Sequence, residues 1–392
     1  MVIIMKEAVI TAAVRTPVAK IRGALSSYQA DEIGAFVVRE VVARAGIRPE
    51  EIEDVFFGNA RNVDLQTPAR VIALASGLPI SVPGQTVERG CASALCAIHD
   101  AALSICAGEG EIYLAGGVES CTHGPFLLEK QVKAGNAPPR FLPGRMVPLN
   151  MENLSMGMTA EVVAKQYGIT REDCDTFALL SQQRAATAWQ AGCFQEQVVP
   201  IRLPKDRNGV SQIFDKDETV RESTMESLSR LKPSFCATGV STAGNSSPLT
   251  DGAAAVVMMS REMAQTRGAE ILGVYRGFAV AGLDPRTMGL GPIYATKKLL
   301  KKTGLSMEDI DLIEINEAFA AQSVACIKEL GMDIDKVNVN GGAIALGHPF
   351  GATGAILVTK LVYELKRRGL RRGLVTFCIG GGQGAAMLIE RP

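Results

Sequence analysis

Several classes of protein are excluded by what this 392-residue sequence lacks. It has no net charge, because 41 Lys and Arg residues balance 41 Asp and Glu residues. It therefore shows neither the basic bias of a nucleic-acid-binding protein nor an acidic disordered tail. Aromatic residues make up only 5% of the chain, which leaves no surplus of rings for stacking on bases. We expect no nucleic-acid partner.

Metal-ligand and disulfide patterns are also lacking. The nine cysteines are an odd number with no Cys-x-x-Cys pair, and there are only three histidines. This pattern fits neither a disulfide framework nor a metal site. A reducing compartment suits such a chain best, so we predict a cytoplasmic location and no bound metal.

Membrane-directed segments are missing as well. The first residues, MVIIMKEAVITAAVRTP, lack the charged-then-apolar order of a secretory leader, and Glu7 and Arg15 interrupt any membrane span. The longest stretch without charge, residues 337–359, contains five glycines and a proline. That composition is not typical of a transmembrane helix, so we expect no membrane partner.

The sequence is rich in glycine, with 40 residues, and many of them form clusters that directly follow apolar runs. The runs 111–115 and 374–378 read as buried strands, and each leads into consecutive glycines. Amphipathic stretches between such runs predict helices, and alternating strands and helices favour an α/β fold with mainly parallel sheets. The predicted helices are 31–45, 94–107, 159–166, 173–191, 295–303, 318–330 and 355–368.

The chain also repeats itself. Gly46-Ile-Arg-Pro-Glu-Glu-Ile-Glu-Asp-Val near the front resembles Gly304-Leu-Ser-Met-Glu-Asp-Ile-Asp-Leu-Ile near the back. A strand, a glycine-containing turn, a helix and a strand ending in Gly-Gly follow in each half. We predict two similar α/β halves, 1–119 with 251–270 and 271–392. Residues 120–250 fit neither half, so we predict that they form an inserted loop domain, which suits either substrate contacts or surface decoration equally well.

Three side chains stand where α/β folds place chemistry. Cys91 lies where an apolar strand meets small residues and a helix, and a helix N-terminus stabilises a thiolate. His348 lies in a glycine-rich turn before a helix, where it could act as a base. Cys378 ends a strand against a glycine loop and could act as an acid or base. A structural role is the alternative for each of them, because most cysteines are buried hydrophobes and a lone histidine is usually structural, but the position of His348 favours catalysis.

Other polar residues have weaker claims. Asn316 is predicted to open a helix, so it is a candidate N-cap as well as a site residue. His99 falls inside a predicted helix and is expected to pack or face solvent, whereas His123 follows a strand end and could line the site. No Walker A sequence occurs, and Gly380–Gly384 lacks the βαβ context of a dinucleotide fingerprint. One nucleophilic Cys, one His base and a second Cys make acyl exchange on a thiolate the most economical chemistry.

These residues resemble the thiolase family over essentially the whole chain. The resemblance is carried by the Cys91 turn, Ser241-Thr-Ala-Gly-Asn-Ser-Ser, Asn316-Glu-Ala-Phe-Ala-Ala-Gln, Asn340-Gly-Gly-Ala-Ile-Ala-Leu-Gly-His-Pro and Cys378-Ile-Gly-Gly-Gly-Gln-Gly. It implies a five-layered αβαβα fold from two similar halves, with a loop domain that binds CoA. It implies coenzyme A and acyl-CoA as substrates, no permanently bound cofactor, and a homodimer or homotetramer.

The resemblance also implies a role for each site residue. Cys91 would be the nucleophile that carries the acyl group, His348 its base, and Cys378 the acid or base of the second step. Asn316 would hold one oxyanion with His348 through a water, and the backbone amides of Cys91 and Gly380 would hold the other. The residues implied for CoA or the acyl pocket are Ser247, Phe235, Met288, Phe319 and, more weakly, Arg221.

Two departures from the family pattern bear on the substrate. Ala92-Ser-Ala94 follows the nucleophile where the family has glycine or serine combinations, and Ala94 could reshape the pocket. Ser155 stands where acetoacetyl-CoA-type enzymes have histidine, which favours longer or varied acyl chains. Two alternatives remain open: a condensing relative without thiolytic activity, and a non-catalytic CoA or lipid binder.

Overall fold

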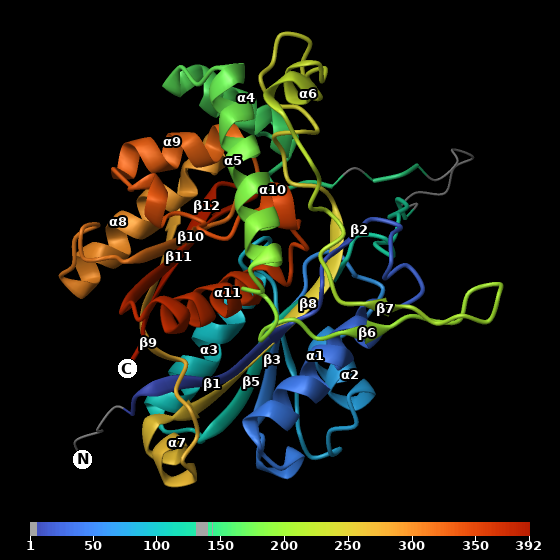
Figure 1. The fold of residues 1–392 in the computed structure, drawn as a ribbon, viewed down its shortest axis with the longest axis vertical. Helices are drawn as coiled ribbons and strands as arrows, with labels where there is room; N and C mark the ends of the chain where they lie inside the picture. Colours follow the sequence, from blue (N-terminus) through green and yellow to red (C-terminus); the bar gives the residue numbers. More distant parts are fainter. Residues whose placement is uncertain (1–5, 131–139, 143) are drawn as a thin grey trace.

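The computed structural model describes residues 6–130, 140–142 and 144–392, and one long β-sheet runs through its centre (Figure 1). The ten strands lie in the spatial order β10-β11-β12-β9-β1-β8-β5-β3-β4, with β2 paired to β8. They are β1 (Ala8–Arg15), β2 (Ala19–Lys20), β3 (Asp54–Gly58), β4 (Gln85–Val87), β5 (Ile112–Ser120), β8 (Thr250–Ser260), β9 (Gly273–Gly282), β10 (Leu312–Ile315), β11 (Arg372–Ile379) and β12 (Gln383–Glu390).

The sheet contains one topology twice. In chain order, β1, β3, β4, β5 and β8 correspond to β9, β10, a bridge at Val337, β11 and β12. In the first half β8 is antiparallel to β1 and β5, and β3 is parallel to β5 and β4. In the second half β12 is likewise antiparallel to β9 and β11, and β10 is parallel to β11 and to the bridge at Val337. The halves join where β1 pairs with β9, with Val9 opposite Val274. The predicted duplication is confirmed.

The expected predominance of parallel pairing is wrong. Only β3–β4, β3–β5 and β10–β11 are parallel among the named strands, and the remaining pairs of the central sheet are antiparallel. The reason is visible at Gly380–Gly382, where a short turn joins β11 to β12. A turn this short produces a hairpin, whereas a parallel pair needs a long crossover.

The helices and the two parts of this sheet form alternating layers. The layers run from α1 and α2, through the β1–β8–β5–β3–β4 part of the sheet, to α3 and α11, then through the β9–β12–β11–β10 part to α8 and α9. Neighbouring residues on one strand point into different layers: Leu114 packs with α1 and α2, whereas Ala115 packs with α3 and α11. The fold is therefore the predicted αβαβα arrangement. The helices are α1 (Ala30–Ala45), α2 (Pro68–Ala75), α3 (Ser93–Ala107), α8 (Gly291–Thr303), α9 (Ala320–Leu330) and α11 (Thr353–Arg368).

The central helix α3 is mostly apolar, and the sheet and α11 cover the greater part of its surface. The segment Gly90–Ala107, which includes α3, has the length and hydropathy to cross a membrane. Its side chains are instead part of the main core, with Leu95, Ile98 and Ile105 completely buried. A helix that is apolar around its circumference suits such a central position.

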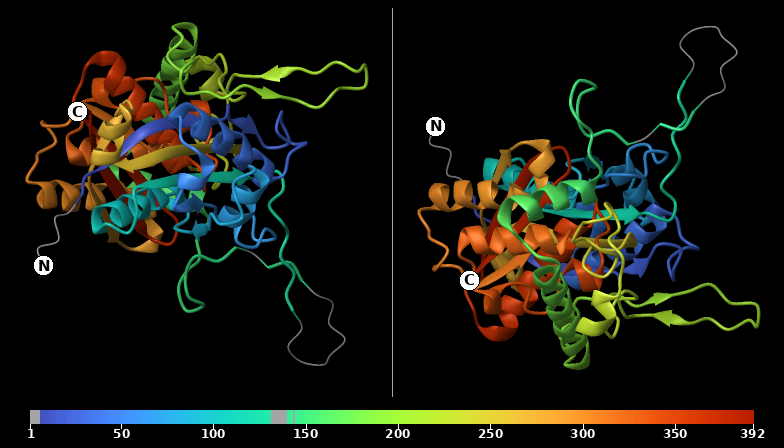
Figure 2. Two further views of the ribbon diagram at one scale, coloured as in Figure 1. Left: turned by 90° about the horizontal axis from the view of Figure 1, so that it is seen from below. Right: turned by 90° about the horizontal axis from the view of Figure 1, so that it is seen from above.

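Residues 120–250 lie between β5 and β8, at the place where the second half has only the Gly380–Gly382 turn. They form α4 (Met156–Tyr167), α5 (Arg171–Gln190), the short α6 (Met225–Ser229) and the hairpin β6 (Ile201–Arg202) to β7 (Ile213–Phe214). Helices α4 and α5 pack on α9, and the hairpin projects away from the body (Figure 2). The boundaries of the predicted inserted domain stay a prediction. The remaining helices are α7 (Arg261–Arg267), α10 (Ala343–Leu346) and the 3₁₀ turns η1 (Pro49–Glu51), η2 (Pro285–Leu290) and η3 (Ile334–Lys336).

Candidate active site

The duplicated topology places Cys91 and His348 in corresponding loops, each just before a central helix. Cys91 lies between β4 and α3, and His348 lies between α10 and α11. The first turns of α3 and α11 touch so closely that a Cβ on Gly354 would collide with the backbone nitrogen of Leu95. The carbonyl oxygen of Gly351 likewise lies against Gly117 of β5. Glycine at these positions lets the two loops come together.

His348 is buried, and its ring is oriented by two neighbours. Its Nδ1 lies 2.7 Å from Oγ1 of Thr353, and that hydroxyl donates its proton to the carbonyl of Pro349 at 2.8 Å. Because the hydroxyl has only one proton, it must accept from Nδ1–H. Nε2 is therefore the unprotonated nitrogen, and Nδ2 of Asn316 lies 3.3 Å from it. Burial lowers the pKa of His348 to about 3, so the ring is a neutral base.

Asn316 does not open a helix as predicted. It follows β10, and the helix α9 begins only at Ala320. Its backbone N–H instead donates to the carbonyl of Thr376 at 3.0 Å, which continues the pairing of β10 with β11 for one more residue. Among the described residues, its buried Oδ1 finds no donor. The side chain therefore points to His348 rather than capping a helix.

Cys91 is not the activated thiolate that a helix N-terminus predicts. Desolvation and, to a smaller extent, the nearby charge of Glu119 raise the pKa of its thiol to about 12. The N–H groups of Gly380 and of Cys91 itself point at the sulfur and lower the pKa, but not enough to compensate. In the resting site Cys91 is consequently a neutral thiol that needs a base, while two amides converge on its sulfur.

Cys378 lies close to Cys91, at the end of β11, and is almost completely buried. Desolvation raises the pKa of Cys378 well above the ordinary thiol value, and the proximity of Cys91 raises it further. Its side chain packs with Met288, Phe319 and Met156 in an apolar cluster. The ring of Phe235 meets that of Phe319 edge-on, with centroids 5.8 Å apart. The structure thus brings Met288 and Phe319 beside the second cysteine and places Phe235 against Phe319.

The two polar residues predicted for CoA lie along the adjoining loop. Oγ of Ser247 donates to the carbonyl of Ala318 at 3.1 Å, so this serine lies beside the turn that carries Asn316. The guanidinium of Arg221 is exposed and donates to the carbonyl of Ala243 at 3.1 Å. Ser247 therefore belongs to the loop Ser241–Ser247, and Arg221 contacts this loop from its exposed side.

The comparisons with known proteins agree along the whole chain. A model of the thiolase N-terminal domain matches residues 8–262, and a model of the thiolase C-terminal domain matches residues 269–391. The chain belongs to the thiolase family. The acetyl-CoA acetyltransferase of Chromobacterium violaceum is 44% identical over 98% of this chain and 100% of its own length. The 3-ketoacyl-CoA thiolase of Bacillus subtilis is also 44% identical, with the same coverage.

Solved structures give the same result for the thiolase fold. The acetyl-CoA acetyltransferase of Bacillus anthracis superposes with a TM-score of 0.93 at 43% identity, covering 99% of each chain. Human mitochondrial 3-ketoacyl-CoA thiolase superposes with a TM-score of 0.91 at 36% identity, covering 99% of this chain and 100% of its own. The predicted fold and the predicted enzyme class, an acyltransferase of the thiolase type, are confirmed. These relatives favour neither the non-thiolytic condensing relative nor the non-catalytic binder.

The other two histidines of this thiolase contact neither Cys91, His348 nor Cys378 through a described hydrogen bond. His99 stacks on Phe278 with ring centroids 4.2 Å apart, and its Nδ1 is 2.8 Å from the hydroxyl of Tyr275. This confirms the packing role expected for it. His123 lies in the loop after β5, where its Nδ1 is 3.1 Å from Oγ of Ser120.

The two departures from the family pattern make packing and capping contacts, and their effect on the substrate stays a prediction. Ala94 is completely buried, and its Cβ lies against Gly117, so it packs α3 onto the sheet. Oγ of Ser155 accepts from the N–H of Met158 at 3.3 Å and caps α4. Neither contact involves Cys91 or Cys378.

Sequence reasoning missed two buried carboxylates next to the site. Glu119 lies at the end of β5, and Glu317 directly follows Asn316. Both are almost completely buried. The available signal was a charged residue inside an otherwise apolar strand or strand end, because such a charge needs partners in the core.

Proposed function

We propose that this thiolase catalyses the reversible reaction 3-ketoacyl-CoA + CoA = acyl-CoA + acetyl-CoA, with acetoacetyl-CoA among its substrates. CoA thioesters are then substrates, and no permanently bound cofactor takes part. The observation that carries the proposal is the close contact between the first turns of α3 and α11, which brings the loop with the unprotonated Nε2 of His348 to the loop with the neutral Cys91 thiol. A neutral pair of this kind transfers its proton only when the substrate is attacked.

In the first half-reaction, the Cys91 sulfur attacks the 3-keto carbon while its proton passes to Nε2 of His348. The bond between C2 and C3 then breaks, which leaves the acyl group on Cys91 and a carbanion on acetyl-CoA. Cys378 donates its proton to that carbanion. A thiol whose pKa is raised by burial is still protonated at neutral pH, as this step requires.

In the second half-reaction, the thiol of CoA attacks the acyl-Cys91 thioester and gives its proton to the Cys378 thiolate. The departing Cys91 sulfur recovers its proton from His348, so both cysteines return to the starting state. The amides of Cys91 and Gly380 would stabilise one oxyanion, and Asn316 with His348 the other. Loss of one such donor typically costs roughly 3–4 kcal/mol of transition-state stabilisation.

The test is CoA-dependent thiolysis of acetoacetyl-CoA beside a longer 3-ketoacyl-CoA, followed as loss of the enolate absorbance. We expect cleavage of both by the wild-type protein and none by Cys91→Ser. Normal turnover in the serine variant would refute the proposed nucleophile. Preference for the longer substrate would support the interpretation of Ser155, whereas cleavage of acetoacetyl-CoA alone would show that Ser155 does not set chain length.

We also propose that the chain forms a homodimer or homotetramer in the cytoplasm. Its family membership supports self-association, and so does the position of β4, a strand at the sheet edge just before Cys91. The nine cysteines are all free, which suits a reducing compartment. Light scattering after size-exclusion chromatography would measure the oligomeric state.

A further inference from the structure

The loop that carries His348 is held near both ends by carboxylates from other parts of the fold. Four residues before His348, the N–H of Ile344 donates to Oε2 of Glu317 at 3.1 Å. Three residues after it, the N–H of Gly351 donates to Oε2 of Glu119 at 2.9 Å. These two contacts bracket the catalytic ring, and neither carboxylate has a role in the reaction proposed above.

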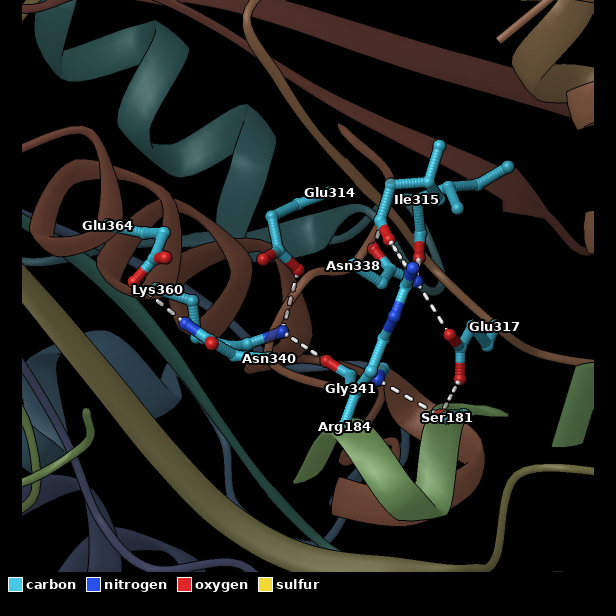
Figure 3. Close-up of polar contacts among 12 residues, drawn as sticks. Ser181, Arg184, Glu314, Ile315, Glu317, Asn338, Asn340, Gly341, Lys360 and Glu364 are labelled. Carbon is cyan, nitrogen blue, oxygen red and sulfur yellow. Dashed lines mark hydrogen bonds and ion pairs between the residues drawn. The ribbon is translucent and has the colours of Figure 1, made fainter. Parts of the chain in front are cut away.

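Glu317 connects three elements through its carboxylate (Figure 3). Oε2 also accepts from Oγ of Ser181 on α5 at 2.7 Å, and Oε1 accepts from Nδ2 of Asn338 at 2.7 Å. Because Glu317 directly follows Asn316, it ties the backbone that carries Asn316 to the loop that carries His348. One side chain therefore links the two segments that carry Asn316 and His348, whose Nδ2 and Nε2 atoms lie 3.3 Å apart.

Glu119 does the same from the other side. Its Oε2 accepts the N–H of Ala60 at 3.2 Å, and its Oε1 accepts the N–H of Arg61 at 3.0 Å. It thereby joins the end of β5, the loop after β3 and the residue Gly351. The carbonyl oxygen of Gly351 also lies so close to Gly117 that a side chain on Gly117 would collide with it. The backbone of Gly351 is therefore held by van der Waals contact with Gly117 and by its hydrogen bond to Glu119.

We infer that Glu317 and Glu119 are positioning residues, which fix the His348 loop so that Nε2 faces Cys91 in the geometry that proton transfer needs. The inference rests on the proposed roles of Cys91 and His348. Reaction rates depend steeply on such alignment, and a displacement of about 1 Å can cost on the order of 100-fold. Both carboxylates only accept hydrogen bonds from their partners. A side chain of similar size without an acceptor therefore removes the hydrogen bonds that hold the His348 loop.

Glu317→Met and Glu119→Met provide that change, and Glu317→Gln and Glu119→Gln keep one acceptor oxygen. The matched control is Glu364→Met. Glu364 is likewise a buried carboxylate that accepts from an asparagine, Asn340 at 2.9 Å, but its other partners are arginines of its own helix. The control thus removes a carboxylate of the same neighbourhood without releasing Ile344 or Gly351.

The experiment is a stopped-flow single turnover of acetoacetyl-CoA without added CoA, in which acylation of Cys91 appears as a burst of enolate loss. The burst amplitude counts folded, competent sites, and the burst rate reports the proton transfer and attack. We expect both methionine variants to lose at least about 10-fold in burst rate per competent site. The glutamine variants should lie between them and the wild type, and Glu364→Met should match the wild type in rate.

The outcomes separate the inference from the proposed function. An absent burst in the wild type, or a normal one in Cys91→Ser, would overturn the proposed chemistry itself. A normal burst rate in all four variants, with or without a reduced amplitude, would show that the carboxylates only stabilise the fold and would overturn the inference. A faster burst in Glu119→Gln would overturn the role of Glu119, because removing its charge lowers the pKa of Cys91. If a methionine variant does not fold, its glutamine counterpart decides.

Discussion

The hydroxyl of Thr353 should decide which nitrogen of His348 carries the proton. In Thr353→Val the shape of the side chain is kept, but the Nδ1–H group loses its acceptor at 2.7 Å. Leaving one buried donor unpaired costs about 1–3 kcal/mol. Oδ1 of Asn316, which has no donor among the residues that the structure describes, then offers an alternative, because after rotation of the amide it accepts a hydrogen bond from a protonated Nε2. In that tautomer Nε2 carries a proton and has no lone pair with which to accept the proton of Cys91.

The expected loss follows from this free energy. Each 1.36 kcal/mol changes the balance of the two tautomers tenfold, so the competent form falls by roughly 5- to 150-fold. We expect kcat for thiolysis of acetoacetyl-CoA to fall by that factor, while KM for CoA changes less than about threefold. Steady-state loss of the enolate absorbance measures both parameters.

Thr353→Ser is the control, because it retains the hydroxyl that accepts from Nδ1 and donates to Pro349. We expect its kcat to stay within about threefold of the wild type, with its residual loss reflecting only the missing methyl group. If Thr353→Val also kept its kcat, the tautomer would be set by something other than this hydroxyl, and the argument that Nε2 is the base would be refuted.

Two further predictions concern the stability of the parts around the site. In Lys360→Met, the buried Glu314 carboxylate loses the ammonium group that lies 2.7 Å away. We therefore expect the free energy of unfolding, measured in urea, to fall by about 3–5 kcal/mol. The double variant Glu314→Gln/Lys360→Met should lose less, and an equal or larger loss in it would contradict this prediction. Burial lowers the pKa of His348 from 6.5 to about 3, so between these pH values the unfolded chain binds more protons and stability falls as the pH falls. This one residue should account for roughly 4 kcal/mol by pH 3.5, and His348→Gln should show a shallower pH dependence of unfolding; an unchanged slope would refute a buried neutral ring.

Much of the fold is readable from local pattern. The predicted helices all form, with ends that differ by a few residues, because each one repeats apolar side chains at helical spacing. The eight-residue helix α2 was missed, since two turns give too few repeats to separate it from a loop. The antiparallel pairs were missed because the direction of a strand depends on its connection, and an insertion hides the connection between β5 and β8.

The site divides in the same way. Cys91, His348 and Cys378 stand in glycine-rich turns at strand ends, which is a local signal, and the motifs around them identify the family. The pKa of Cys91 could not be predicted, because the burial that raises it comes from the tertiary fold. Glu314 shows the same limit: its charge within an apolar strand indicates a buried partner, but nothing local indicates Lys360, 46 residues away.

The paired loops of the two halves have a consequence for the origin of the enzyme. A gene formed by joining two copies of one half would first have encoded the same loop twice, at both central helices. The present loops differ: one carries the sulfur and the other carries the imidazole. Divergence after duplication has distributed the reacting groups over the two copies, so neither half retains a complete set. Turnover therefore requires that the two halves be joined.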